Sequence, residues 1–130
     1  MPKRILLIED DPPTIDLYEE IFKKGDFEVE NLTWGKQSLE RLSEIREGKK
    51  EKPDLVLLDL ILPDINGIEI LKEAKNNEKT KDIPFFVLTN YTDPELEKEI
   101  WKLGVEKYII KANYTPSQLV KVIKGWFEKR

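Results

Sequence analysis

Four short runs of apolar residues constrain the fold of this chain more than any other feature of its sequence. They lie at residues 5–8, 55–58, 85–88 and 108–110 and read ILLI, LVLL, FFVL and YII. Each has the length of a β-strand and none alternates with polar residues, which is the pattern of a strand covered on both faces. A weaker segment at residues 27–32 does alternate, and we expect it to form a more exposed edge strand.

Apolar residues at helical spacing occupy the segments between these runs. These stripes lie at residues 15–22, 39–45, 70–74, 96–103 and 119–127. Prolines stand where the helices would begin, and glycines at positions 25, 48 and 104 come just after a stripe, as helix stop signals do. Five strands alternating with five helices predict one α/β domain over residues 1–130, with a parallel sheet and right-handed crossovers.

The composition excludes several classes of site. The 130 residues include 26 acidic and 22 basic ones, for a net charge of -4, which is not the electrostatic footprint of a nucleic-acid-binding protein. The chain has no cysteine and no histidine, which excludes disulfides, thiolate nucleophiles, Ser-His-Asp triads and histidine-bearing zinc sites. No apolar run is long enough for a signal peptide or a membrane span, so we expect a cytoplasmic protein.

Polar residues follow four of the five expected strands directly, and the segment at residues 27–32 contributes nothing comparable. They are Glu9, Asp10 and Asp11 after the first apolar run, Asp59 after the second, Thr89 after the third and Lys111 after the fourth. Each alone is also typical of a helix cap or a solvated surface. Because ligands bind at the carboxyl ends of the strands in a doubly wound sheet, we expect these residues to converge on one site.

The chemistry of this set favours phosphoryl transfer. Clustered carboxylates repel one another unless a cation joins them, and oxygen ligands without histidine or cysteine indicate Mg²⁺ or Mn²⁺. A hydroxyl and an ammonium beside them can bind further anionic oxygens. The set contains an aspartate nucleophile, a metal site, one hydroxyl donor and one lysine.

At these residues the sequence resembles the receiver domain of two-component response regulators. The matching segments are ILLIEDDPP, LVLLDLILPDINGIEIL, FFVLTN and YIIKA, and the resemblance extends from Lys3 to about Phe127. It implies a doubly wound, flavodoxin-like fold with five helices and a five-stranded parallel sheet in the order 2-1-3-4-5.

The resemblance also implies a role for each site residue. Asp59 is the phosphoacceptor, and Thr89 and Lys111 are the catalytic groups that hold the phosphoryl oxygens. The metal ligands it implies are Glu9, Asp10, Asp59 and the carbonyl of Ile61, with Mg²⁺ as the cofactor and Mn²⁺ possible in its place. Thr89 and Tyr108 form the conformational switch that reports phosphorylation.

Partners follow from the same resemblance. The phosphoryl donor is a histidine kinase or a histidine phosphotransfer protein. A downstream protein binds the face formed by the fourth helix, the fifth strand and the fifth helix, at about residues 94–103, 107–110 and 116–128. We expect no nucleic acid or membrane partner, and a receiver that promotes its own phosphorylation and dephosphorylation rather than an enzyme.

Two other functions are compatible with parts of the sequence. A pseudo-receiver would bind partners without phosphorylation, but the complete set of acceptor, acidic, hydroxyl and lysine residues argues against it. Phosphatases of the haloacid dehalogenase type also form aspartyl phosphate, yet they carry a DxD pattern at the nucleophile and residues 59–61 read DLI.

Three positions depart from the family pattern. Ala112 follows Lys111 where a cis proline is usual, and Asn90 follows Thr89 where a small residue is usual. Ile61 is apolar where many members are polar, and with Tyr91 it is expected to overhang the path of the hydrolytic water.

Overall fold

The computed structural model describes residues 2–130, so Met1 of the predicted 1–130 domain lies outside the described residues. Strands and helices alternate along the chain as expected. The strands are β1 (Arg4–Ile8), β2 (Glu28–Leu32), β3 (Leu55–Leu58), β4 (Phe85–Thr89) and β5 (Lys107–Ile110). The helices are α1 (Pro12–Lys24), α2 (Gly35–Arg46), α3 (Gly67–Lys75), α4 (Pro94–Leu103) and α5 (Pro116–Glu128), with a 3₁₀ turn, η1 (Lys111–Asn113), before α5.

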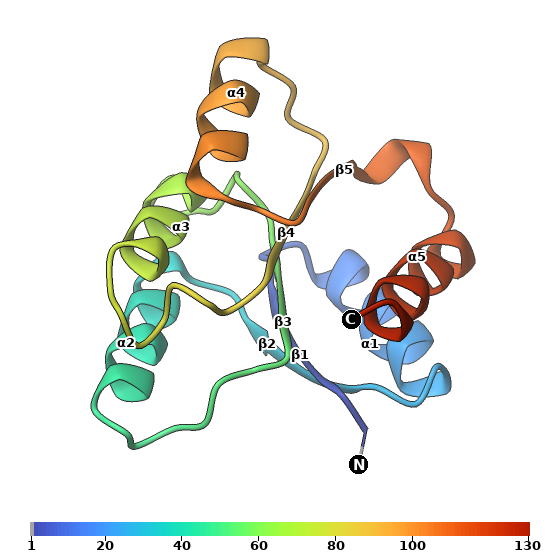
Figure 1. Cartoon of the computed structure of the whole chain (residues 1–130). Coiled ribbons are helices and arrows are strands. Elements are labelled where there is room, and N and C mark those ends of the chain that lie inside the picture. The colour runs from blue at the N-terminus through green and yellow to red at the C-terminus, as the bar shows by residue number, and fades with distance from the viewer. Residues whose placement is uncertain (1) are drawn as a thin grey trace.

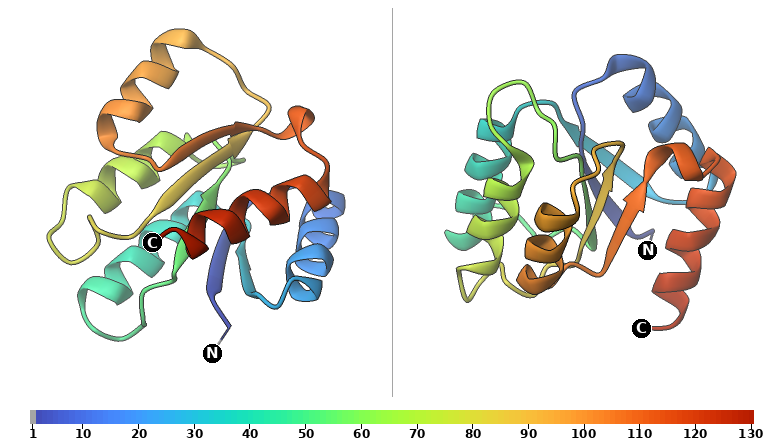
Figure 2. Two further views of the ribbon diagram at one scale, coloured as in Figure 1. Left: turned by 45° about the vertical axis from the view of Figure 1, so that its right-hand side comes forward. Right: turned by 90° about the horizontal axis from the view of Figure 1, so that it is seen from above.

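The strands form one parallel sheet in the order β2-β1-β3-β4-β5, which confirms the predicted fold class and strand order. Helices α1 and α5 cover one face of the sheet, and α2, α3 and α4 cover the other (Figure 1 and Figure 2). In the described part of the chain, no helix combines the length and the apolar character needed to cross a membrane.

Successive residues of each central strand pack into two different cores. In β1, Leu6 and Ile8 pack with residues of α2, α3 and α4, while Ile5 and Leu7 pack with residues of α1 and α5. All four β1 side chains are at most 5% exposed, so both faces of this strand are dry. Burial of one such side chain stabilises the fold by about 1.5–3 kcal/mol, which is why these runs do not alternate.

The edge strands are where the sequence-based expectations were partly wrong. Strand β2 is an exposed edge as predicted, although it begins at Glu28 instead of residue 27. Strand β5 is the other edge, as the order 2-1-3-4-5 implied, but its apolar run predicted cover on both faces, and Tyr108 and Ile110 are only half-buried. Among residues 2–130 no strand pairs with its outer side, so its side chains have strand neighbours on one side only, and Ile109 alone is buried.

Local signals place the helix ends largely as predicted. Prolines lie in the first turns of α1, α4 and α5, where a missing N–H leaves no hydrogen bond unmade. The caps before them are Asp11, Asp93 and Thr115, whose side chains accept backbone N–H groups of the first turn. Helix α4 ends at Gly104, whose left-handed φ of 94° strains any residue with a Cβ.

We expect the centre of the sheet to dominate stability. Leu57→Ala should lower the free energy of unfolding by about 2–5 kcal/mol in urea denaturation, because this side chain is fully buried and its loss leaves a cavity. Leu17→Ala is the matched control on α1, where Leu17 is 45% exposed, and should change it by no more than about 0.5 kcal/mol. Equal losses in the two variants would contradict this description of the core.

Candidate functional site

The residues predicted from the strand ends do converge at the carboxyl edge of the sheet. The segment directly after β1 contains Glu9, Asp10 and Asp11. Asp59 directly follows β3, Thr89 is the last residue of β4, and Lys111 directly follows β5. All of them line one cavity of about 290 Å³, together with Thr14, Ile61, Asn90 and Tyr91. This convergence arises because parallel strands present all their carboxyl ends at one edge.

Asp59 is held at both of its carboxylate oxygens. Its Oδ1 accepts the Thr89 hydroxyl at 2.9 Å and the Ile61 backbone N–H at 3.1 Å, and its Oδ2 accepts the Lys111 ammonium at 2.7 Å. The Thr89 oxygen itself accepts the N–H of Tyr91 at 3.1 Å, which leaves the hydroxyl hydrogen free for Asp59. Asp59 is only 7% exposed, so these donors replace most of its water.

Helix α3 packs directly against the backbone of Asp59. A Cβ at Gly67 would lie 2.4 Å from the Asp59 carbonyl oxygen, so any larger residue would push the helix away. The Gly67 N–H donates to the carbonyl of Leu60 at 2.8 Å, and the Asn66 side chain caps the first turn. The loop after β3 is thus fixed at both ends.

Glu9 and Lys111 form a buried ion pair beside Asp59. The Glu9 Oε2 accepts the backbone N–H groups of Asp10 at 3.1 Å and Asp11 at 3.2 Å, and its Oε1 pairs with Lys111. Burial raises the pKa of Glu9, and the contact with Lys111 opposes that rise. Burial alone would lower the pKa of Lys111, but its hydrogen bonds and charge interactions with Asp59 and Glu9 raise it overall.

The acids of the site can hold a divalent cation. One carboxylate oxygen from each of Glu9, Asp10 and Asp59 lies within 4.8 Å of the others. Within residues 2–130 the Asp10 side chain makes no hydrogen bond and no ion pair, and it is half-buried at the cavity, which leaves it available as a ligand. Three carboxylates without nitrogen or sulfur ligands suit Mg²⁺ or Mn²⁺.

Lys111 changes the expected balance of charges. The sequence predicts repulsion among three carboxylates, but the ammonium lies between Glu9 and Asp59 and offsets it for those two. Asp10 has no such partner in the described chain, so the remaining repulsion falls mainly on Asp10. Asp11 has a separate role, because it accepts the N–H of Thr14 at 3.2 Å and caps α1.

Two large side chains stand at the margin of the cavity. Ile61 is 56% exposed and Tyr91 is 42% exposed, and both line the cavity beside Asp59. The hydroxyl of Tyr108 on β5 donates to the Tyr91 carbonyl at 2.9 Å, so the predicted switch residue is bound to the loop after β4. Burial raises the pKa of Tyr108.

Two supporting residues were missed from the sequence. The Asn31 side chain at the end of β2 donates to the carbonyls of Leu7 at 3.0 Å and Glu9 at 3.2 Å, so β2 does contribute to the site. Asp64 accepts the N–H groups of Gly35 at 2.8 Å and Lys36 at 2.9 Å, which ties the loop after Asp59 to the start of α2. A polar amide inside a strand was the only sequence signal for Asn31.

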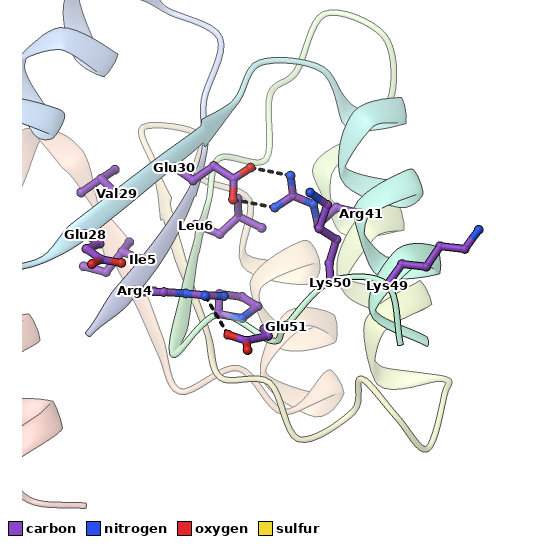
Figure 3. Close-up of a pocket in the computed structure, with 11 residues that line it drawn as sticks. Arg4, Ile5, Leu6, Glu28, Val29, Glu30, Arg41, Lys49, Lys50 and Glu51 are labelled. Atoms are coloured by element: carbon purple, nitrogen blue, oxygen red, sulfur yellow. Dashed lines mark hydrogen bonds and ion pairs between the residues drawn. The ribbon is translucent and has the colours of Figure 1, made fainter. Parts of the chain in front are cut away.

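A separate cavity of about 480 Å³ lies near the amino ends of β1 and β2 (Figure 3). Its lining carries charges of both signs, and two pairs of them form ion pairs. Arg4 contacts Glu51 at 3.0 Å, and Arg41 pairs with Glu30. It contains none of the residues predicted for phosphoryl chemistry, so the carboxyl edge of the sheet remains the candidate site.

Comparison with known proteins agrees with this geometry. The family model described as the response regulator receiver domain matches residues 5–124. The polar-differentiation response regulator DivK of Brucella anthropi is 28% identical over 126 residues, which cover 97% of this chain and 97% of that protein.

Solved structures are similar over nearly the whole chain. The phosphorylated cyanobacterial phytochrome response regulator RcpA has a TM-score of 0.82 and 32% identity, with 98% of this chain and 93% of that chain covered. The Mn²⁺-bound form of response regulator Rcp1 has a TM-score of 0.81 and 33% identity, with 95% and 91% covered.

Removal of the Asp10 charge should stabilise the protein in the absence of metal. We expect Asp10→Asn to raise the melting temperature by about 3–5 °C without Mg²⁺, because it relieves repulsion worth about 1 kcal/mol, and to abolish the further rise that Mg²⁺ gives wild type. Asp16→Asn removes the same charge from an exposed position on α1 and is the control. A lower melting temperature for Asp10→Asn without metal would show that the repulsion is unimportant.

Proposed function

The chain belongs to the response regulator receiver domain family, and from this premise we propose that it accepts a phosphoryl group on Asp59 from a phosphohistidine donor. The observation that carries the proposal is the position of Asp59 among Glu9, Asp10, Thr89 and Lys111 in one cavity. No other carboxylate of the described chain meets an acidic pair, a hydroxyl donor and an ammonium together.

The side chains of the site suit an in-line displacement. A carboxylate oxygen of Asp59 attacks phosphorus, and the P–N bond to the donor imidazole breaks as the new O–P bond forms. Such transfers need positioning and charge neutralisation more than covalent help. Thr89 and Lys111 already donate to the two oxygens of Asp59, at 2.9 Å and 2.7 Å, and can turn to the phosphoryl oxygens.

We further propose that Glu9, Asp10 and Asp59 hold Mg²⁺ or Mn²⁺, with the carbonyl of Ile61 as a further ligand. A cation bound there supplies positive charge to the anionic oxygens of the transferred group. The open carboxylate of Asp10 supports this role, and the relative Rcp1 has been solved with Mn²⁺. The Glu9 carboxylate is already bonded to Lys111 and to the backbone N–H groups of Asp10 and Asp11. Its part in the metal site is therefore to orient Lys111 and this segment of backbone.

The output is proposed to pass through Tyr108 to the face formed by α4, β5 and α5. The chain of contacts that supports it runs from Asp59 to the Thr89 hydroxyl, from there to the N–H of Tyr91, and from the Tyr91 carbonyl to Tyr108. When Thr89 turns from the carboxylate to a phosphoryl oxygen, this chain must adjust. A downstream protein that binds the exposed edge of β5 can read the difference.

The surroundings of the cavity suit a protein donor, a histidine kinase or a histidine phosphotransfer protein, and we propose that the two proteins meet in the cytoplasm. Trp34, Ile61, Tyr91 and Tyr114 lie in four of the loops at the carboxyl edge of the sheet, and each is at least 39% exposed. Exposed apolar side chains around a polar site are typical of a protein interface. The chain itself is proposed to be a signalling receiver and not an enzyme that turns over a separate substrate.

Labelling by a small-molecule donor tests the acceptor. Incubation with acetyl phosphate and Mg²⁺ should add one phosphoryl group to wild type, measured by intact mass, and none to Asp59→Asn. Asp16→Asn changes an exposed acid on α1 that does not line the cavity, and this variant should still be labelled. Equal labelling of wild type and Asp59→Asn would overturn the assignment, and a lack of any labelling would favour a pseudo-receiver.

The phosphoryl group should be lost slowly, because the side chains at the cavity margin crowd the path of the attacking water. The double variant Ile61→Asn, Tyr91→Glu should lose phosphate about tenfold faster than wild type, which corresponds to ~1.4 kcal/mol of barrier. Phosphate release at constant Mg²⁺ measures the rate. Tyr114→Glu alters an exposed tyrosine outside the cavity and should leave it unchanged. A change below about twofold in the double variant contradicts the shielding.

A further inference from the structure

Asn90 and Ala112, two of the positions that depart from the family pattern, follow Thr89 and Lys111 and contact each other. The side-chain Oδ1 of Asn90 accepts the backbone N–H of Ala112 at 2.9 Å. Each departure is needed for this bond. Glycine or alanine at position 90 has no side-chain oxygen, the serine hydroxyl is shorter than the asparagine amide, and proline at position 112 has no N–H to donate.

The bond lies just beyond the end of the β4–β5 ladder. The last paired residues of these strands are Thr89 and Ile110. After them β4 leads to α4 on one face of the sheet, and β5 leads through η1 to α5 on the other face (Figure 2). The Tyr108 hydroxyl already bonds β5 to the carbonyl of Tyr91 in the loop after β4. The Asn90 bond adds a direct contact between the residues that follow Thr89 and Lys111.

We propose that Asn90 is a positioning residue, which ties the loop after β4 to the loop after β5 and so holds Thr89 and Lys111 at a fixed spacing. This inference rests on the proposed function, since Thr89 and Lys111 must bind oxygens of the same phosphoryl group. The bond connects residues directly adjacent to both, so a displacement of either loop moves its donor.

The hydrogen bond between Asn90 and Ala112 restrains the loop after β5, as the ring of a proline at position 112 would restrain it covalently. Proline fixes φ near -65°, which stiffens the residue after the lysine in receivers that have it. Ala112 is an exposed residue that lacks that restriction, and its N–H is an additional polar group next to Lys111. Asn90 satisfies this N–H and restrains the same loop, so the two departures act as one complementary pair.

Amide hydrogen exchange of Ala112 tests the tie without any phosphoryl chemistry. Asn90→Ala should speed exchange of this N–H about fivefold or more, because its acceptor is lost. Asn90→Asp keeps an acceptor oxygen and should preserve the protection. Asn113→Ala removes an amide from the same loop, where the described chain gives that side chain no hydrogen bond, and should have no effect. An unprotected Ala112 amide in wild type overturns the proposal.

Binding of beryllofluoride, a phosphoryl mimic, tests the positioning role. With saturating Mg²⁺, Asn90→Ala should bind beryllofluoride about fivefold more weakly than wild type and Asn113→Ala, while the affinity for Mg²⁺ alone stays the same. A purely structural role would leave beryllofluoride binding unchanged or weaken both ligands together, and either result overturns the proposal.

A double-mutant cycle gives an independent reading. Ala112→Pro removes the donor, so in that background Asn90→Ala should cause no further loss of beryllofluoride affinity. Additive losses contradict a shared bond. If wild type does not bind beryllofluoride at all, the proposed function fails, and the positioning role fails with it even where the Ala112 amide is protected.

Discussion

The ion pairs that Lys111 makes with Glu9 and Asp59 are the interaction on which the site depends. Two carboxylates that are 2% and 7% exposed would be strongly disfavoured as charged groups without a cation between them. The ammonium comes from the end of β5, across two strands from β1 and one from β3. The site therefore exists only when three distant segments of the chain are assembled, and its charge state is coupled to the fold.

The sheet makes that assembly accurate. The register pairs Ile8 with Leu58, so β1 and β3 end together, and it pairs Thr89 with Ile110, so β4 and β5 end together two residues further on. Each site residue comes at its strand's end or within three residues after it. Apolar packing on both faces keeps these ends rigid, whereas the loops beyond them depend on single hydrogen bonds. Asn31, Asp64 and Asn90 each make such bonds, and together they brace loops on three sides of Asp59. A rigid scaffold with braced loops is what positioning of a phosphoryl group requires.

The two ends of the sheet have different physical characters. At the carboxyl end, unpaired or singly paired acids and exposed aromatic side chains remain open to ligands and partners. At the amino end, the cavity of β1 and β2 is lined by nearly equal numbers of basic and acidic residues, so it offers no comparable excess of charge (Figure 3). Strand β5 joins the carboxyl end to an exposed edge through Tyr108, which gives the site a physical route to the surface.

The sequence by itself determined the fold class and most of the site. Unbroken apolar runs between helical stripes indicate the strands of a parallel sheet, and residues directly after such strands meet at one edge, so Asp59, Thr89 and Lys111 were identified from their positions alone. The apolar run did not reveal that Tyr108 and Ile110 are only half-buried, because YII reads the same in a central strand and its burial depends on how many neighbours pack beside it. Only the tertiary structure placed Lys111 between Glu9 and Asp59 and brought Asn31 to β1 and Asn90 to Ala112. Each of these contacts joins residues that are distant in sequence and depends on where their side chains point in the folded protein. No local sequence pattern encodes that direction.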